Sequence, residues 1–79
     1  MSPTVLREKG YRFFFFSREE SRMHIHVSAT TGEAKFWLEP KIALARNHRL
    51  TRIQLTEAES IIEAHYDEFT KAWRTHFKG

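Results

Sequence analysis

Residues 24–38 hold two runs of alternating polar and apolar side chains, joined by the short segment 29–32. Side chains alternate between the two faces of a β-strand, so each run predicts a strand with one polar and one apolar face. A four-residue loop at 29–32 fixes the register of a hairpin, with these pairs on the polar face: His24–Trp37, His26–Lys35 and Ser28–Glu33. A shift by one residue would lose this match. We therefore expect the hairpin to organise the fold.

The segments around the hairpin predict further strands. Residues 4–8 and 11–16 are rich in β-forming side chains. They are separated by Lys9-Gly10, which has the length of a two-residue turn and would place Arg7 opposite Arg12. Residues 41–45 predict a weaker fifth strand, followed by a connection over residues 46–49.

The last third of the chain predicts one amphipathic helix. From Leu55 to Phe77 the apolar side chains recur at spacings of three and four residues. Thr51 and Thr56 each begin a capping-box pattern, so both starts stay open. From Thr56 the helix would run for about 21 residues, or about 32 Å, which exceeds the length of about 17 Å of a five-residue strand.

Together these elements predict a single domain over residues 1–79. The fold class is α+β: a four- or five-stranded antiparallel meander, with strands within 4–45, packed against one long C-terminal helix at about 52–77. So short a chain buries only about 60% of its unfolded surface, and it has no cysteine to form a disulfide. Residues 13–16 are four phenylalanines that point alternately to both faces. We therefore expect a dimer, either with itself or with a partner.

Charge and hydropathy narrow the class of protein. The net charge is +3, and no apolar run approaches the length of a membrane span. The absence of cysteine fits the cytoplasm. We therefore expect a cytoplasmic protein without a signal peptide and without membrane contact.

The polar face of the hairpin carries the candidate catalytic residues. His24 and His26 would lie roughly 6–7 Å apart on one strand. In metal-independent RNA cleavage, one histidine would take the 2′-hydroxyl proton and a second acid would protonate the leaving oxygen. Lys35 and Arg12 would stabilise the charge on the phosphate. Glu33 lies on the same face, which gives this candidate set: His24, His26, Glu33, Lys35 and Arg12.

Two other interpretations of the histidines stay open. As metal ligands they would need a third partner, Glu33 or the distant His48, and the sequence predicts neither a metal site nor a cofactor. In a structural role, His24 would pack on Trp37, His26 would hydrogen-bond Glu33 or a loop carbonyl, and the face would dock a partner protein.

Candidate binding residues lie on the sheet and beyond it. Tyr11 and Trp37 could stack on bases, as in sheet-based binders of single-stranded nucleic acid, or could be packing residues. A basic arc with no acid between its ends follows the hairpin: Lys41, Arg46, Arg49 and Arg52. We expect this arc at the start of the helix, where phosphates bind readily. The alternatives are an acidic partner and a solvated rim, and charge runs of this kind are more often solvated surface.

Several motifs together resemble a known family. They are GYRFFF at 10–15, HIHV at 24–27, GEAKFWL at 32–38, AW at 72–73, and Phe77 with Gly79 at the end of the chain. This set is similar to a small bacterial family of domains of unknown function, over essentially the whole chain. Members are often encoded beside a second small uncharacterised domain, and the pair is commonly described as a toxin–antitoxin module.

The resemblance implies a biological setting. The chain would be the toxin component of a type II toxin–antitoxin module, acting on RNA or on translation, with a cognate small antitoxin-like protein as its partner and RNA as a further one. The alternative is a non-catalytic module whose sheet face docks a partner protein. The toxin hypothesis and the docking hypothesis differ in what the polar face of the sheet contacts: RNA or a partner protein.

Overall fold

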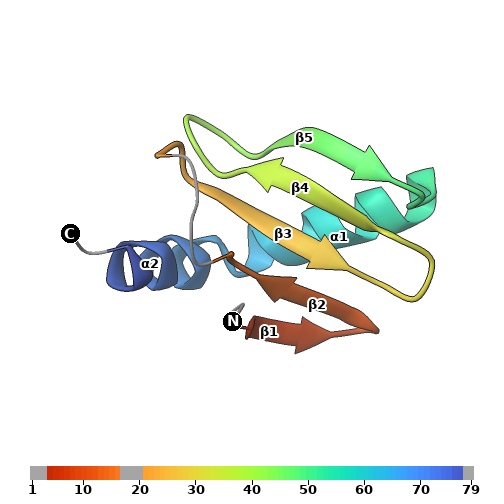
Figure 1. Ribbon diagram of the computed structural model, residues 1–79, viewed down its shortest axis with the longest axis horizontal. Helices are drawn as coiled ribbons and strands as arrows, with labels where there is room; N and C mark the ends of the chain where they lie inside the picture. The colour runs from red at the N-terminus through yellow and green to blue at the C-terminus, as the bar shows by residue number, and fades with distance from the viewer. Residues whose placement is uncertain (1–3, 17–20, 78–79) are drawn as a thin grey trace.

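The computed structural model describes residues 4–16 and 21–77 of the 79-residue chain. Over these residues it forms a five-stranded antiparallel sheet in the order β1-β2-β3-β4-β5, with two helices (Figure 1). The strands are β1 (Thr4–Glu8), β2 (Tyr11–Phe14), β3 (His24–Ser28), β4 (Glu33–Trp37) and β5 (Ala43–His48). The expected α+β class and antiparallel meander are confirmed. No helix in this part of the chain has the length and apolar character needed to cross a bilayer.

The central hairpin has the predicted register. The cross-strand pairs of β3 and β4 include His24–Trp37, His26–Lys35 and Ser28–Glu33. The loop between them is closed by a 2.9 Å hydrogen bond, in which the Ala29 amide donates to the Gly32 carbonyl. Because both strands alternate strictly, only this register buries all of their apolar side chains on one face.

The first hairpin places two arginines opposite each other. Lys9 and Gly10 both adopt positive φ, 53° and 85°, as a two-residue hairpin turn requires. Arg7 therefore pairs with Arg12, as predicted. Arg12 donates from Nε to the hydroxyl of Thr4 at 2.7 Å, and its guanidinium lies 4.4 Å from the ring centre of Phe14. These contacts hold Arg12 in place beside a like charge.

The fifth strand begins and ends later than residues 41–45. It spans Ala43–His48, so Arg46 and His48 are strand residues and not part of a connection. The register shifts between Lys35 and Phe36 of β4, whose partners are Arg46 and Leu44, which leaves Ala45 as an extra residue in β5. This irregularity interrupts the alternation that would have revealed the strand in the sequence.

A side-chain turn ends β5 and leads into the first helix. The Asn47 side chain accepts a hydrogen bond from the Leu50 amide and donates one to the Leu50 carbonyl, both at 3.0 Å. Arg49 adopts a positive φ of 71° within this turn. Helix α1 (Arg52–Ala64) then starts at Thr51, whose side chain and that of Gln54 form a capping box. Of the two predicted helix starts, Thr51 and Thr56, the structure therefore uses Thr51.

The prediction of one long helix is wrong. A second helix, α2 (Tyr66–His76), follows α1 after His65, whose φ of −116° and ψ of 22° interrupt the helical backbone. The His65 imidazole lies 3.1 Å from the Glu8 carboxylate in β1 and 3.0 Å from that of Glu68. After the break, Phe69 near the start of α2 still packs on Phe13 of β2, while the later part of α2 extends beyond the ends of the strands (Figure 1).

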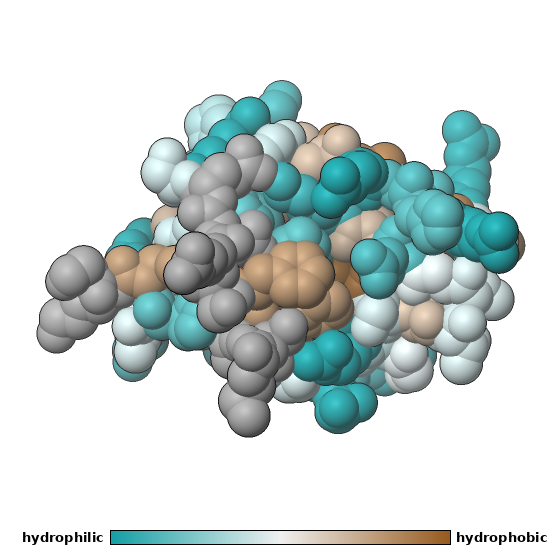
Figure 2. Space-filling model, in the orientation of Figure 1, coloured by the Kyte–Doolittle hydropathy of each residue, from teal (hydrophilic) through white to brown (hydrophobic). Residues whose placement is uncertain are grey.

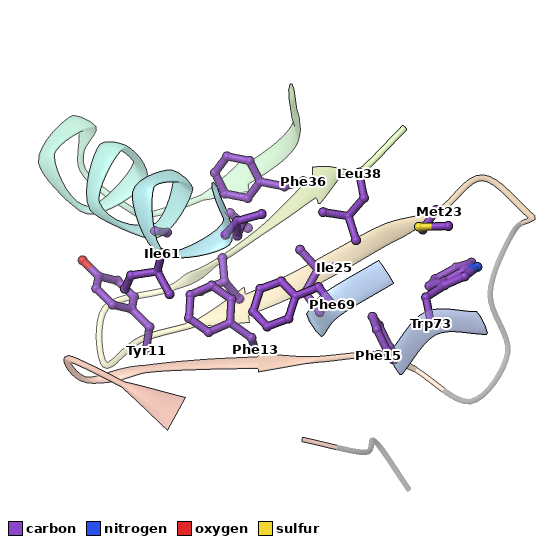
Figure 3. Packing of buried hydrophobic residues seen from close by; sticks show 14 of the residues in the cluster. Tyr11, Phe13, Phe15, Met23, Ile25, Phe36, Leu38, Ile61, Phe69 and Trp73 are labelled. Carbon is purple, nitrogen blue, oxygen red and sulfur yellow. The ribbon is translucent and has the colours of Figure 1, made fainter. Parts of the chain in front are cut away.

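The core lies between the sheet and the two helices (Figure 3). Ile25 and Phe36 face the helices, as predicted, and are at most 1% exposed. Phe13 contacts Phe69 of α2, with ring centres 5.4 Å apart. Trp73, one turn further along α2, belongs to the same buried cluster. The inner face of the sheet is thus filled, and the opposite face carries the polar side chains.

Candidate functional site

The face of the sheet opposite the helices, called the outer face below, carries two rows of side chains. Strand register sets the first row as Arg7, Arg12, Ser28, Glu33 and His48, and the second as Thr4, Phe14, His26, Lys35 and Arg46. These rows contain four Arg and Lys side chains and a single carboxylate, that of Glu33. In Figure 2, a hydrophobic patch near the centre of the view borders hydrophilic residues above it and to its right. The outer face is therefore basic, with an aromatic part.

A hollow of about 270 Å³ opens over β3, β4 and β5 on this face. It is lined by His26, Glu33, Ala34, Lys35, Arg46 and His48. Glu33 of β4 is directly opposite His48 of β5, and Lys35 is directly opposite Arg46. The hollow thus combines a carboxylate, two imidazoles and two cations.

The backbone beneath the hollow is held by a close approach at Gly32. A Cβ atom at this position would lie 2.1 Å from the His48 carbonyl oxygen and 2.8 Å from Cβ of Arg49. Only glycine lets the β3–β4 loop come this near to the end of β5. The two hydrogen bonds of the Asn47 side chain to the Leu50 backbone also constrain the chain at the end of β5. Glu33 and His48 therefore project from backbone that is constrained on both strands.

The two histidines of β3 have different environments. His24 is fully buried, and its Nδ1–H donates to the Arg22 carbonyl at 2.7 Å. Its ring makes edge contacts with Trp37 and Trp73, at centroid distances of 5.7 and 5.0 Å. His24 and Trp37 are therefore neighbours, as predicted. Burial of this kind excludes substrate from His24, which makes it a packing residue.

His26 lies at the edge of the hollow. It is 7% exposed and stacks on Phe14, with ring centres 5.5 Å apart. Phe16 contacts the same imidazole edge-on at 4.4 Å. The rings of His24 and His26 are 5.1 Å apart, so the structure brings the predicted pair together. Only His26 reaches the hollow, however.

The two aromatic residues predicted for base stacking lie on opposite faces. Trp37 is half-buried on the outer face, with the Arg22 guanidinium 4.0 Å and the Lys35 ammonium 4.5 Å from its ring centre. Tyr11 is buried against the helices and donates a 2.7 Å hydrogen bond to Glu57. Burial and this hydrogen bond raise the pKa of Tyr11 to about 12. Tyr11 is therefore a core residue.

The basic arc is divided by β5. Arg46 lies within the strand and lines the hollow, Arg49 is in the turn, and Arg52 is the first residue of α1. Lys41 precedes β5, at the other end of this strand. The four cations thus do not form one patch, and Arg46 is the member that joins the outer-face site.

His48 is the site residue that the sequence did not assign to the sheet. We expected residues 46–49 in a connection, which left His48 as a distant metal ligand only. The polar residues at 46 and 48 alternate as in a strand, but the extra residue at Ala45 hides the continuity with residues 43–44. Over residues 4–16 and 21–77, no group of three or more His, Asp or Glu side chains is arranged to hold a metal ion.

The fold and the site define a small α+β domain with a basic outer sheet face. The model of a family described as "Domain of unknown function (DUF4160)" matches residues 10–74, from the start of β2 nearly to the end of α2. The chain belongs to this family. No curated protein and no solved structure matches the chain significantly.

Proposed function

We propose that this chain is the toxin component of a type II toxin–antitoxin module and that the outer face of its sheet binds RNA. The toxin role comes from the resemblance of its motifs to a family described in that setting. The observation that carries the RNA-binding half is the basic outer face with its hollow. A cytoplasmic location and a partner, either a cognate small antitoxin-like protein or a second copy, belong to the same proposal.

The cations of the outer face lie in pairs. Arg7 is opposite Arg12, and Lys35 is opposite Arg46. Neighbouring strands are about 4.8 Å apart, so each pair concentrates positive charge in a small area. Such a surface attracts the phosphates of a nucleic acid and gains free energy by releasing their counterions. Glu33 is the one carboxylate in the two rows that opposes this attraction.

An aromatic group beside the cations favours a single strand. Trp37 is half-buried next to Lys35, whose ammonium group lies 4.5 Å from its ring centre. Unstacked bases of single-stranded RNA stack on aromatic side chains that lie beside a basic groove. The combination supports single-stranded RNA over a duplex, because the bases of a duplex are stacked on one another and are not free to stack on Trp37.

The test is binding of a fluorescent single-stranded RNA, followed by anisotropy at two salt concentrations. For three phosphate contacts, affinity should fall roughly 20-fold between about 50 and about 200 mM salt. The double variant Arg12→Gln with Arg46→Gln should bind at least ~10-fold more weakly, and its salt slope should drop by roughly 1.4.

The matched control removes the same charge elsewhere. Lys71 and Arg74 are exposed on α2, away from the outer face, so Lys71→Gln with Arg74→Gln should keep nearly full binding. An equal loss in both double variants would show that the outer face is not the site. If the wild-type protein does not bind RNA at low salt, the proposal fails, and a module that docks a protein replaces it.

A further inference from the structure

The hollow on the outer face holds a carboxylate and an imidazole in direct register. Glu33 and His48 are opposite each other on β4 and β5, where Cβ atoms of cross-strand partners are about 4.5–5.5 Å apart. Both residues are exposed. Two groups of this kind, close together and reachable by substrate, are what a general base and a general acid require.

Two cations flank this pair along the same strands. Lys35 lies two residues after Glu33 on β4, and Arg46 lies two residues before His48 on β5. Both cations are therefore in the next row of the outer face. Residues two apart in a strand are about 7 Å apart, which is within reach of long side chains. A phosphate between the rows would therefore have the acid–base pair on one side and the two cations on the other.

We propose that Glu33 and His48 are catalytic residues of an RNA-cleaving site, an inference that rests on the proposed function. The substrate is a phosphodiester bond of single-stranded RNA with a free 2′-hydroxyl. The Glu33 carboxylate takes the proton of the 2′-hydroxyl while the 2′-oxygen forms a bond to phosphorus. The bond from phosphorus to the 5′-oxygen breaks, and the His48 imidazolium donates its proton to that oxygen.

The products are a 2′,3′-cyclic phosphate and a 5′-hydroxyl, and the atoms balance without a further reactant. Arg46 and Lys35 stabilise the additional negative charge on the phosphate as it becomes five-coordinate. The constrained backbone at Gly32 and Asn47 keeps the acid and base at a fixed separation. This assignment replaces the pair His24 and His26, because His24 is sealed in the interior.

The experiment measures cleavage and binding separately. Cleavage of a short RNA is followed by mass spectrometry, with the 2′,3′-cyclic phosphate as the diagnostic product. Binding is measured by anisotropy with the 2′-O-methyl form of the same RNA, which lacks the attacking hydroxyl. Glu33→Gln and His48→Gln should each slow cleavage by roughly 10²–10⁴-fold. Binding of the 2′-O-methyl RNA should change by less than about threefold, since both variants keep Lys35 and Arg46, the cations that hold the phosphate.

The pH profile provides a readout that a structural role would not change. The wild-type profile of kcat/KM should be bell-shaped, with Glu33→Gln removing the acidic limb and His48→Gln the alkaline limb. Glu63→Gln on α1 and His76→Gln on α2 are controls at exposed positions away from the hollow, purified in the same way. Both should cleave like the wild-type protein.

The outcomes of this experiment distinguish the proposed cleavage site from the proposed RNA-binding function on which it rests. If the wild-type protein binds RNA but forms no cyclic phosphate, the cleavage site is refuted and the RNA-binding function stands. If either Glu33→Gln or His48→Gln cleaves at the wild-type rate, the assignment of that residue is refuted. If the 2′-O-methyl RNA is not bound, the proposed function fails and the inference fails with it.

Discussion

The position of the hollow depends on Gly32, because this residue has no side chain. A Cβ atom on Gly32 would lie 2.1 Å from the His48 carbonyl oxygen, which is too close for two atoms that are not bonded. The same contact joins the β3–β4 loop to the end of β5, so it connects the strands that carry Glu33 and His48. Fold and site therefore depend on the same close approach.

We expect Gly32→Ala to destabilise the protein by about 1–3 kcal/mol, because backbone atoms must move to admit the methyl group. Urea unfolding followed by circular dichroism measures this change. Thr30→Ala, in the same loop and exposed, should stay within about 0.5 kcal/mol of the wild-type protein. A wild-type unfolding midpoint for Gly32→Ala would mean that the loop does not approach β5 in this way.

His65 connects the break between the helices to the first strand. A hydrogen bond to Glu68 raises its pKa above the ordinary 6.5, partial burial acts in the opposite direction, and a hydrogen bond to Glu8 raises the pKa further. A raised pKa means that the folded state favours the protonated imidazole. Its contribution to stability is therefore complete below the ordinary pKa and is lost as the pH rises through the raised value.

We expect Glu68→Gln to lower the pKa of His65, since it removes the carboxylate with the largest effect. An NMR titration of the imidazole Cε1–H signal measures this pKa directly. Urea unfolding across neutral pH should show that stability falls with rising pH more steeply in the wild-type protein than in Glu68→Gln. Glu63→Gln has the same charge change and should behave like the wild-type protein. If the imidazole titrates alike in both variants, the contact between His65 and Glu68 is absent in solution.

Among the elements, α1 has the clearest local start signal. The Thr51 hydroxyl accepts a hydrogen bond from the Gln54 amide at 3.1 Å, and the Gln54 side chain accepts one from the Thr51 amide at 2.9 Å. We expect Thr51→Ala to reduce the free energy of unfolding by about 1 kcal/mol. Thr56→Ala, at the start that the structure does not use, should have a smaller effect. Equal losses would indicate that the helix begins later in solution.

The elements differ in how far the sequence determined them. Strict alternation and a four-residue loop were enough to predict the β3–β4 register, because one register alone buries Ile25, Val27 and Phe36 together. The position of β5 depended on an extra residue at Ala45 and on the Asn47 turn, neither of which alternation describes. The break at His65 could not be predicted, since the apolar spacing continues through it and the residue that His65 contacts there, Glu8, is far away in the sequence.

The candidate site was predicted in part for the same reasons. His26, Glu33 and Lys35 were placed on one face because they lie in the predicted hairpin, and they do line the hollow. His48 joins them only through the register of β5. Burial of His24 depends on packing against Trp73 of α2, which is a tertiary contact.

At the scale of the whole molecule, stability depends on one core of large side chains. Phe36 is 1% exposed between β4 and the helices. We expect Phe36→Ala to cost about 3–5 kcal/mol through the cavity that it leaves, a large part of the stability of so small a domain. Thermal and urea unfolding measure it, with Ile53→Ala as control at a position that is 79% exposed. A nearly unchanged melting temperature would show that Phe36 is not in the core.

Association with a second copy or with a partner protein stays a prediction. The structural features that favour it differ from those expected from the sequence. Phe14 faces away from the helices but is only 4% exposed within the chain, so it does not require a partner to cover it. The helix is broken at His65, so it is not one rod, although α2 still reaches beyond the ends of the strands (Figure 1). The exposed Phe16 and the small size of the domain are the features that still favour a partner.

The central claim is that RNA binds to the outer face of the sheet, and NMR mapping tests it most directly. A ¹⁵N-labelled sample is titrated with short 2′-O-methyl RNA at low salt, so that binding occurs without cleavage. We predict that the largest shift changes fall on β3, β4 and β5, around His26, Lys35, Arg46 and His48, with little change on the exposed faces of α1 and α2. Changes confined to the helices, or none at saturating RNA, would contradict the account.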